Sequence, residues 1–344
     1  MLKKLLINCL KIAISVGIIA YLVMDAVNNR VFTDLGNRPK NWGLLAGSAL
    51  VCFMAVLVTL VRWYYLIRAL DLPVRFQEAI RIGFVGYLFN LSPVGIVGGD
   101  LLKAVMLARN YPGRRAEAAA TVFVDRVIGL YVLFVVASVA ILVTRFWQLP
   151  APNPQAARAI QVICQATLVL TAIGTAAMLA LLIPNLTNGR LTRLLATLPY
   201  VGRVTERLIN AVRMYRWNPL VLVLSFLMSV VVHSLFSIGI YLIAAGLYDE
   251  YPTLGTHFVV SPLSSATGVL PISMGPFEYV LDRLYAAVLL PDGTFMQKGQ
   301  GLVVALGYRI ITVLTAAVGM GYYLASRQEF AAVLHDAGQP ETAE

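Results

Sequence analysis

The sequence predicts an all-α integral membrane protein with six full transmembrane helices and two broken, re-entrant helical hairpins. Hydrophobic residues make up 59% of the 344 residues and charged residues only 13%, whereas soluble domains average about 45–50% and about 25%. No polar stretch is long enough for a soluble domain, so residues 1–344 are predicted to form a single polytopic membrane domain. Two hydrophobic stretches are interrupted midway by proline and glycine, and these are the predicted hairpins.

The full spans are predicted from uninterrupted apolar segments, because about 20 helical residues cross the hydrocarbon core. The first segment has a basic start like that of a signal peptide. It is too long for one, however, and no small-residue cleavage site follows it, so we expect it to remain uncleaved. The six segments lie near residues 5–24, 43–67, 118–144, 159–183, 219–247 and 302–325.

Basic residues in the short loops predict the orientation, because cytoplasmic loops carry an excess of lysine and arginine. Lys3 and Lys4 precede the first span, and arginines follow the second span, the first broken segment and the fourth span. All of these are cytoplasmic if the first hairpin enters and leaves on that face; only the loop at 25–42 is basic on the predicted outer side. We therefore expect a multi-pass protein of the cell inner (plasma) membrane with both termini cytoplasmic. The basic cytoplasmic loops account for the net charge of +10, so we expect no nucleic-acid partner.

The two broken segments run from Phe84 to Leu107 and from Phe258 to Leu290. Three full spans separate them, and an odd number of spans reverses direction, so the hairpins are predicted to open from opposite faces as an inverted repeat. The repeat cores, each a broken hairpin plus a span, are 76–145 and 254–325. The residues expected to shape the two breaks are Pro93, Gly95, Gly98, Gly99, Pro271 and Gly275.

Residues 186–217 alternate apolar and basic side chains at helical spacing. This pattern is typical of helices that lie in the cytoplasmic interface with their arginines facing anionic headgroups. An ordinary positive-inside loop is the alternative.

The first group of candidate site residues consists of Asp100, Lys103, Asp125 and Arg126. Charged side chains within the bilayer are costly and mark functional sites. Asp100 is expected at the N-terminus of a new helix, which would stabilise its ionised form, and a plain N-cap is the alternative role. Lys103 follows one turn later on the same face. Arg126 is expected to pair with Asp100, either to bind a substrate or only to join two parts of the hairpin.

The second group is centred on Glu278, with Asp282 and Arg283 on the same helix and Arg309 in the last span. Arg309 needs a partner, and Glu278 is the predicted one. Broken helices expose backbone amides, and such amides together with Arg126 and Arg309 would suit a phosphate, such as that of a phospholipid headgroup.

Other features of the chain give less support to specific chemistry. His233, in the fifth span, is expected to be hydrogen-bonded to a neighbour rather than to relay protons. The chain has no Walker loop, HExxH, CxxC or GxSxG motif, so neither a metal nor a cofactor is expected.

Two pairs of motifs resemble the lysylphosphatidylglycerol synthase transmembrane family, the flippase-like membrane region of multiple peptide resistance factors. GGDLLKAVMLAR at 98–109 and AAATVFVDRVIGLYVL at 118–133 resemble its first block. LPISMGPFEYVL at 270–281 and LGYRIITVL at 306–314 resemble its second, in which proline, glycine and glutamate precede an arginine in the last span. The resemblance covers nearly the whole chain in order and spacing.

The resemblance implies a protein that moves or binds phospholipids or polyprenyl-linked lipids. The family often has an arginine after the glycine–aspartate pair, whereas the nearest base in this chain is Lys103, which puts bidentate phosphate contact in doubt there. A second departure is the pair Pro276 and Phe277, where the family often has a glycine-rich turn. No counterpart of the aminoacyl-transfer domain is recognised in the chain, so we expect no lysyl transfer. The motif residues that match by position are Gly98, Gly99, Asp100, Asp125, Arg126, Glu278 and Arg309.

Three functions agree with these observations. The leading one is a lipid flippase, not an enzyme, that moves anionic phospholipid or polyprenyl-linked headgroups between leaflets. The second is a membrane enzyme or accessory subunit acting on lipid-linked sugars or phosphates, with Asp100 and Glu278 as acid–base groups. The third is a structural partner of a separate lipid-modifying synthase.

Overall fold

The computed structural model describes residues 2–91, 96–182, 214–215, 218–270, 272 and 274–326. Within these residues the chain forms eleven α-helices and two short 3-10 helices, and no β-strand. The predicted all-α class is therefore confirmed. The predicted interfacial helices at 186–217 lie outside the described residues, apart from 214–215.

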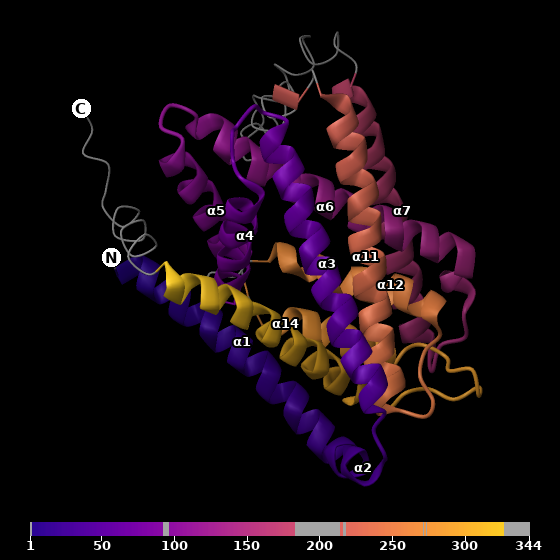
Figure 1. Ribbon diagram of the computed structural model, residues 1–344. Coiled ribbons are helices and arrows are strands. Elements are labelled where there is room, and N and C mark those ends of the chain that lie inside the picture. The colour runs from indigo at the N-terminus through magenta and orange to yellow at the C-terminus, as the bar shows by residue number, and fades with distance from the viewer. Residues whose placement is uncertain are drawn as a thin grey trace. The chain divides into compact units, whose positions relative to one another are not determined.

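Six helices in the described part of the chain are long and apolar enough to cross a membrane, and they coincide with the six predicted spans. Each has 26 to 30 residues, which at 1.5 Å per residue gives roughly 40 Å, enough for the hydrocarbon core with its interfaces. The chain is thus a multi-pass membrane protein. The six helices are α1 (Leu2–Asn28), α3 (Trp42–Arg68), α6 (Arg115–Thr144), α7 (Pro154–Leu182), α11 (Pro219–Leu247) and α14 (Gln300–Ala325) (Figure 1).

Shorter helices occur in two pairs at the two predicted breaks. Helices α4 (Phe76–Phe89) and α5 (Ile96–Asn110) form the first pair, and α12 (Leu254–Ala266) and α13 (Pro276–Tyr285) form the second. The members of each pair pack against each other. Both predicted interruptions are therefore breaks between helices, while their inverted arrangement in a membrane stays a prediction.

The second break has a clear local cause. Gly275, immediately before α13, has a φ of 106°, a conformation that costs glycine little and other residues much. Pro276 then occupies the first position of α13, where its missing N–H breaks no helical hydrogen bond. Pro93, Gly95 and Pro271 lie outside the described residues.

The chain divides into two compact units, and each contains one broken helix pair. One unit holds α12, α13 and Arg309, and the other holds α4, α5 and Arg126. The first unit consists of Met1–Thr59, Gly129–Ala177 and Phe226–Thr312, and the second of Leu60–Ile128, Met178–Ser225 and Val313–Glu344.

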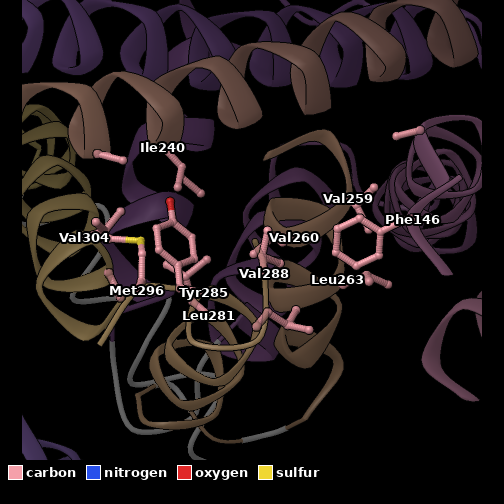
Figure 2. Packing of buried hydrophobic residues seen from close by; sticks show 14 of the residues in the cluster. Phe146, Ile240, Val259, Val260, Leu263, Leu281, Tyr285, Val288, Met296 and Val304 are labelled. Atoms are coloured by element: carbon pink, nitrogen blue, oxygen red, sulfur yellow. The ribbon is translucent and has the colours of Figure 1, made fainter. Parts of the chain in front are cut away.

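The core of the first unit is an apolar cluster around the second helix pair. Figure 2 shows Tyr285 of α13 beside Met296, and Phe146 beside Val259 and Leu263 of α12. Tyr285 and Phe146 are almost completely buried. Because lipid is as apolar as these side chains, close packing rather than escape from water holds such a cluster together.

The core of the second unit depends on close contact between α4 and α5. A side chain at Gly99 would clash with the Asn90 side chain and with the carbonyl of Gly86. Small residues at such contacts let helix backbones approach closely in membranes. Gly98 and Gly99 were expected to shape the break, but both lie inside α5, and Gly99 serves the packing of the two helices.

Candidate functional site

The first predicted ion pair is present in the second unit. Arg126 of α6 donates from Nε to Oδ2 of Asp100 on α5, at 2.8 Å. The arginine side chain is 46% exposed and the aspartate 18%. Among the candidate charges this arginine is therefore the one most open to its surroundings.

The predicted position of Asp100 at a helix N-terminus is wrong. Helix α5 begins at Ile96, four residues earlier, and its first turn contains no acid. The helix starts before the Gly98–Gly99 pair, and Gly99 packs against α4 instead of forming the turn. Asp100 is thus neither an N-cap nor close to the unpaired first amides of α5, and its carboxylate depends on side-chain cations.

Lys103 lies one turn beyond Asp100 and is almost completely buried. Its Nζ is 3.9 Å from Oδ1 of Asp100, which is too far for a hydrogen bond. The same ammonium lies 5.4 Å from the ring centroid of Trp63, within cation–π range. Lys103 is therefore a second cation beside Asp100, held by a longer and weaker contact than that of Arg126.

Asp125 has a partner that the sequence analysis missed. Arg62 of α3 donates from Nε to Oδ1 of Asp125 at 2.8 Å, and from Nη2 to its backbone carbonyl at 3.3 Å. These side chains are only 5% and 9% exposed. The available signal was that Arg62 lies inside the predicted second span, 43–67, where an arginine needs a partner. Because Asp125 and Arg126 are adjacent on α6, they point to different neighbours, and the two acids have separate partners.

The first cluster, defined as Arg62, Asp100, Lys103, Asp125 and Arg126, contains three cations and two anions. One positive charge therefore remains without an anion inside the cluster. Such an excess favours an anionic group from outside, and the planar guanidinium of exposed Arg126 matches the oxygens of a phosphate.

The second predicted ion pair is present in the first unit and is more enclosed. Arg309 of α14 donates to Oε1 of Glu278 from Nε, at 3.0 Å, and also from Nη2. Glu278 is completely buried and Arg309 is 19% exposed. The other carboxylate oxygen of Glu278 accepts from the amide of Gly275 at 2.7 Å. Both oxygens of Glu278 are therefore engaged, one with the arginine and one with the start of α13.

Asp282 and Arg283 do not join that pair. Oδ1 of Asp282 accepts from the amides of Gly299 and Leu302, at 2.8 and 3.1 Å, and so caps the N-terminus of α14. Arg283 instead donates to Asp25 on α1, at 3.2 Å. These two side chains fasten α13 to neighbouring helices.

The hydrogen bond expected for His233 is present, since its Nε2 lies 2.8 Å from the carbonyl oxygen of Gly129. The part of the chain that the structure describes contains no group of three or more His, Cys, Asp or Glu side chains that could hold a metal ion.

Comparison with known proteins gave one match. Residues 8–319 match the family model described as the lysylphosphatidylglycerol synthase TM region. No curated protein and no solved structure matches the chain.

Proposed function

Because the chain belongs to the lysylphosphatidylglycerol synthase transmembrane family, we propose that it moves lipids between the leaflets of the cell inner membrane. Its substrates in this proposal are phospholipids or polyprenyl-linked lipids with anionic headgroups, moved without chemical turnover, and both termini are cytoplasmic. The observation that carries the proposal is the half-exposed Arg126, paired with Asp100 beside a broken helix pair in an otherwise apolar chain.

A phosphate cannot enter hydrocarbon without partners for its charge and its oxygens. In the proposed mechanism the headgroup phosphate replaces Asp100 as the partner of Arg126. Lys103, whose Nζ already lies 3.9 Å from Asp100, then neutralises the displaced carboxylate. The exchange creates no isolated buried charge, so it avoids the main cost of moving the headgroup.

We assign the second pair a positioning role in this mechanism. Glu278 is completely buried and has both oxygens engaged, so an anionic headgroup would have to displace this firmly held carboxylate to reach Arg309. Arg309 then holds the start of α13 in place through Glu278, while Arg126 is the arginine that exchanges partners.

Leaflet exchange in reconstituted liposomes tests the proposal. Vesicles of phosphatidylcholine would carry fluorescent phosphatidylglycerol or a labelled polyprenyl phosphate, with a membrane-impermeant quencher reporting the outer leaflet. We expect wild-type protein to accelerate exchange, and Arg126→Ala to slow it at least tenfold by removing the phosphate contact.

His233→Ala is the matched control, because it changes another polar side chain within a span but leaves the first cluster intact. It should retain most of the activity. Exchange no faster than in protein-free vesicles, across several headgroups, would contradict translocation. Equal activity of the Arg126→Ala and His233→Ala proteins would contradict the assignment of Arg126.

A structural partner of a separate synthase is the second candidate, and the complete burial of Glu278 favours it. That function predicts that Arg126→Ala leaves the cellular phenotype unchanged, while Glu278→Gln lowers the amount of folded protein. Measuring phenotype and protein level for both variants separates the two candidates.

A further inference from the structure

A second basic site lies in the same unit as the first cluster but uses none of its residues. A hollow with a volume of ≈ 630 Å³ is open beside the N-terminal end of α4 and the last turns of α14. Positively and negatively charged side chains and two aromatic rings are among the groups that line it. These residues include Arg75, Phe76, Gln77, Glu78, Arg81 and Tyr322.

The wall of this hollow is fixed by the packing of α14 on α4. A side chain at Gly319 would clash with the carbonyl of Phe84, so glycine there lets the helices approach closely. The ring of Tyr322 consequently stacks on Phe84, with centroids 6.1 Å apart and planes inclined by 24°. One turn later, Ser326 accepts a hydrogen bond from Nη1 of Arg81 at 3.1 Å. The hollow is therefore built into the fold before any ligand arrives.

The charge of the lining favours an anion. Among the described residues of the lining, Arg75 and Arg81 contribute two guanidinium groups and Glu78 contributes one carboxylate. This carboxylate already accepts a hydrogen bond from Nδ2 of Asn110 at 2.6 Å, so one of its oxygens is engaged within the fold. The described part of the lining therefore carries a net positive charge.

The aromatic part of the lining points to an amphiphilic ligand. Phe76 and Tyr322 are both exposed to solvent or lipid, and they lie beside the arginines at the ends of their helices. Aromatic and basic side chains together are typical of the headgroup region of a membrane, where one side of a group is apolar and the other is wet.

From these contacts we propose that the hollow binds a phosphate group through Arg75 and Arg81, as the headgroup of an anionic phospholipid or as a soluble phosphate. Phe76 and Tyr322 contact the apolar part of the ligand when it is a lipid. The site is separate from Arg126 and does not depend on translocation. The loop charges predict that it lies on the cytoplasmic side.

Lipid retention in nanodiscs tests whether the bound phosphate belongs to a lipid headgroup. The full chain would be placed in discs of equal parts phosphatidylglycerol and phosphatidylcholine, and the lipids that stay bound after release would be counted by native mass spectrometry. We expect wild-type protein to retain phosphatidylglycerol preferentially. An arginine near a membrane surface contributes a factor of roughly five to anion binding, so Arg75→Ala with Arg81→Ala should lower the preference at least tenfold.

Arg68→Ala is the matched control, because Arg68 is an exposed arginine in the same unit that does not line the hollow. It should leave the preference unchanged. Arg75→Ala alone removes an exposed side chain that makes no cap contact with α4, so it should fold normally and lower the preference about fivefold.

Calorimetric titration of detergent-solubilised protein with inorganic phosphate tests whether the hollow binds a soluble phosphate. Saturable phosphate binding that is lost in the double variant supports the site with a soluble ligand, and lipid preference lost in that variant supports it with a lipid. The proposal is overturned if wild-type protein shows neither signal, or if the double variant keeps the signal that wild-type protein shows.

Discussion

Replacing Arg62 with methionine removes the cation that faces buried Asp125. The two side chains are 5% and 9% exposed and joined by an Nε–Oδ1 hydrogen bond of 2.8 Å. With charge centres about 4 Å apart and an effective dielectric constant of about 20, their attraction is about 4 kcal/mol. Leaving one buried charge without its partner costs about 3–5 kcal/mol. We therefore expect Arg62→Met to lower the free energy of unfolding by that amount, and Asp125→Leu to do the same.

The double variant Arg62→Met with Asp125→Leu gives the sharper result. Replacing both charges with apolar side chains of similar size is often neutral, so the double variant should recover most of the stability. Unfolding of the detergent-solubilised protein by sodium dodecyl sulfate, followed by circular dichroism, measures all four proteins of the cycle. Single losses below about 1 kcal/mol, or losses that simply add in the double variant, would refute a tightly coupled buried pair.

Three further predictions concern packing, capping and titration. Gly319→Ala should destabilise the protein by about 1–3 kcal/mol, because the added side chain would meet the carbonyl of Phe84. Gly321 lies on the same helix with open space around it, so Gly321→Ala should be neutral or slightly stabilising. Thermal unfolding compares the two variants. Asp282→Ala should cost about 1–3 kcal/mol in the same assay, because it leaves the start of α14 uncapped; full stability would refute the cap. In the loop before α14, hydrogen bonds from the amide and hydroxyl of Thr294 hold the pKa of Asp292 below its ordinary value. Any stability from these bonds is complete above about pH 4 and is lost as the pH falls through the lower folded-state pKa; Thr294→Val should raise that pKa partway, measured by carboxyl NMR, and an unchanged midpoint would contradict the assignment.

Much of the fold could be predicted from the sequence because membrane spans are signalled locally. A continuous apolar run of sufficient length, such as 219–247, has few alternatives to a transmembrane helix. The start of α13 is equally local, since Gly275 adopts a positive φ and Pro276 occupies the first helical position. The pairs Asp100–Arg126 and Glu278–Arg309 were predictable because a charge inside an apolar segment needs a partner.

What the sequence did not show depends on contacts between distant segments. Nothing near Asp125 in the chain indicates that Arg62, on another helix, will reach it. The start of α5 was misplaced because Gly98 and Gly99 resemble turn residues, whereas the close approach of α4 is what requires Gly99. Asp282 likewise looked like a member of a charged cluster, and only the position of α14 makes it a cap.

The contacts of α13 with α14 have a consequence for motion. Glu278 and Asp282 are one turn apart on α13, and they bind α14 at two levels, Asp282 at its first amides and Glu278 at Arg309. Two attachments at different heights prevent both sliding and rotation of one helix along the other. Helix α13 and the first three turns of α14 are therefore expected to move together as one rigid body. Any bending of the second hairpin then takes place on the α12 side of Gly275, because Glu278 also holds the amide of Gly275.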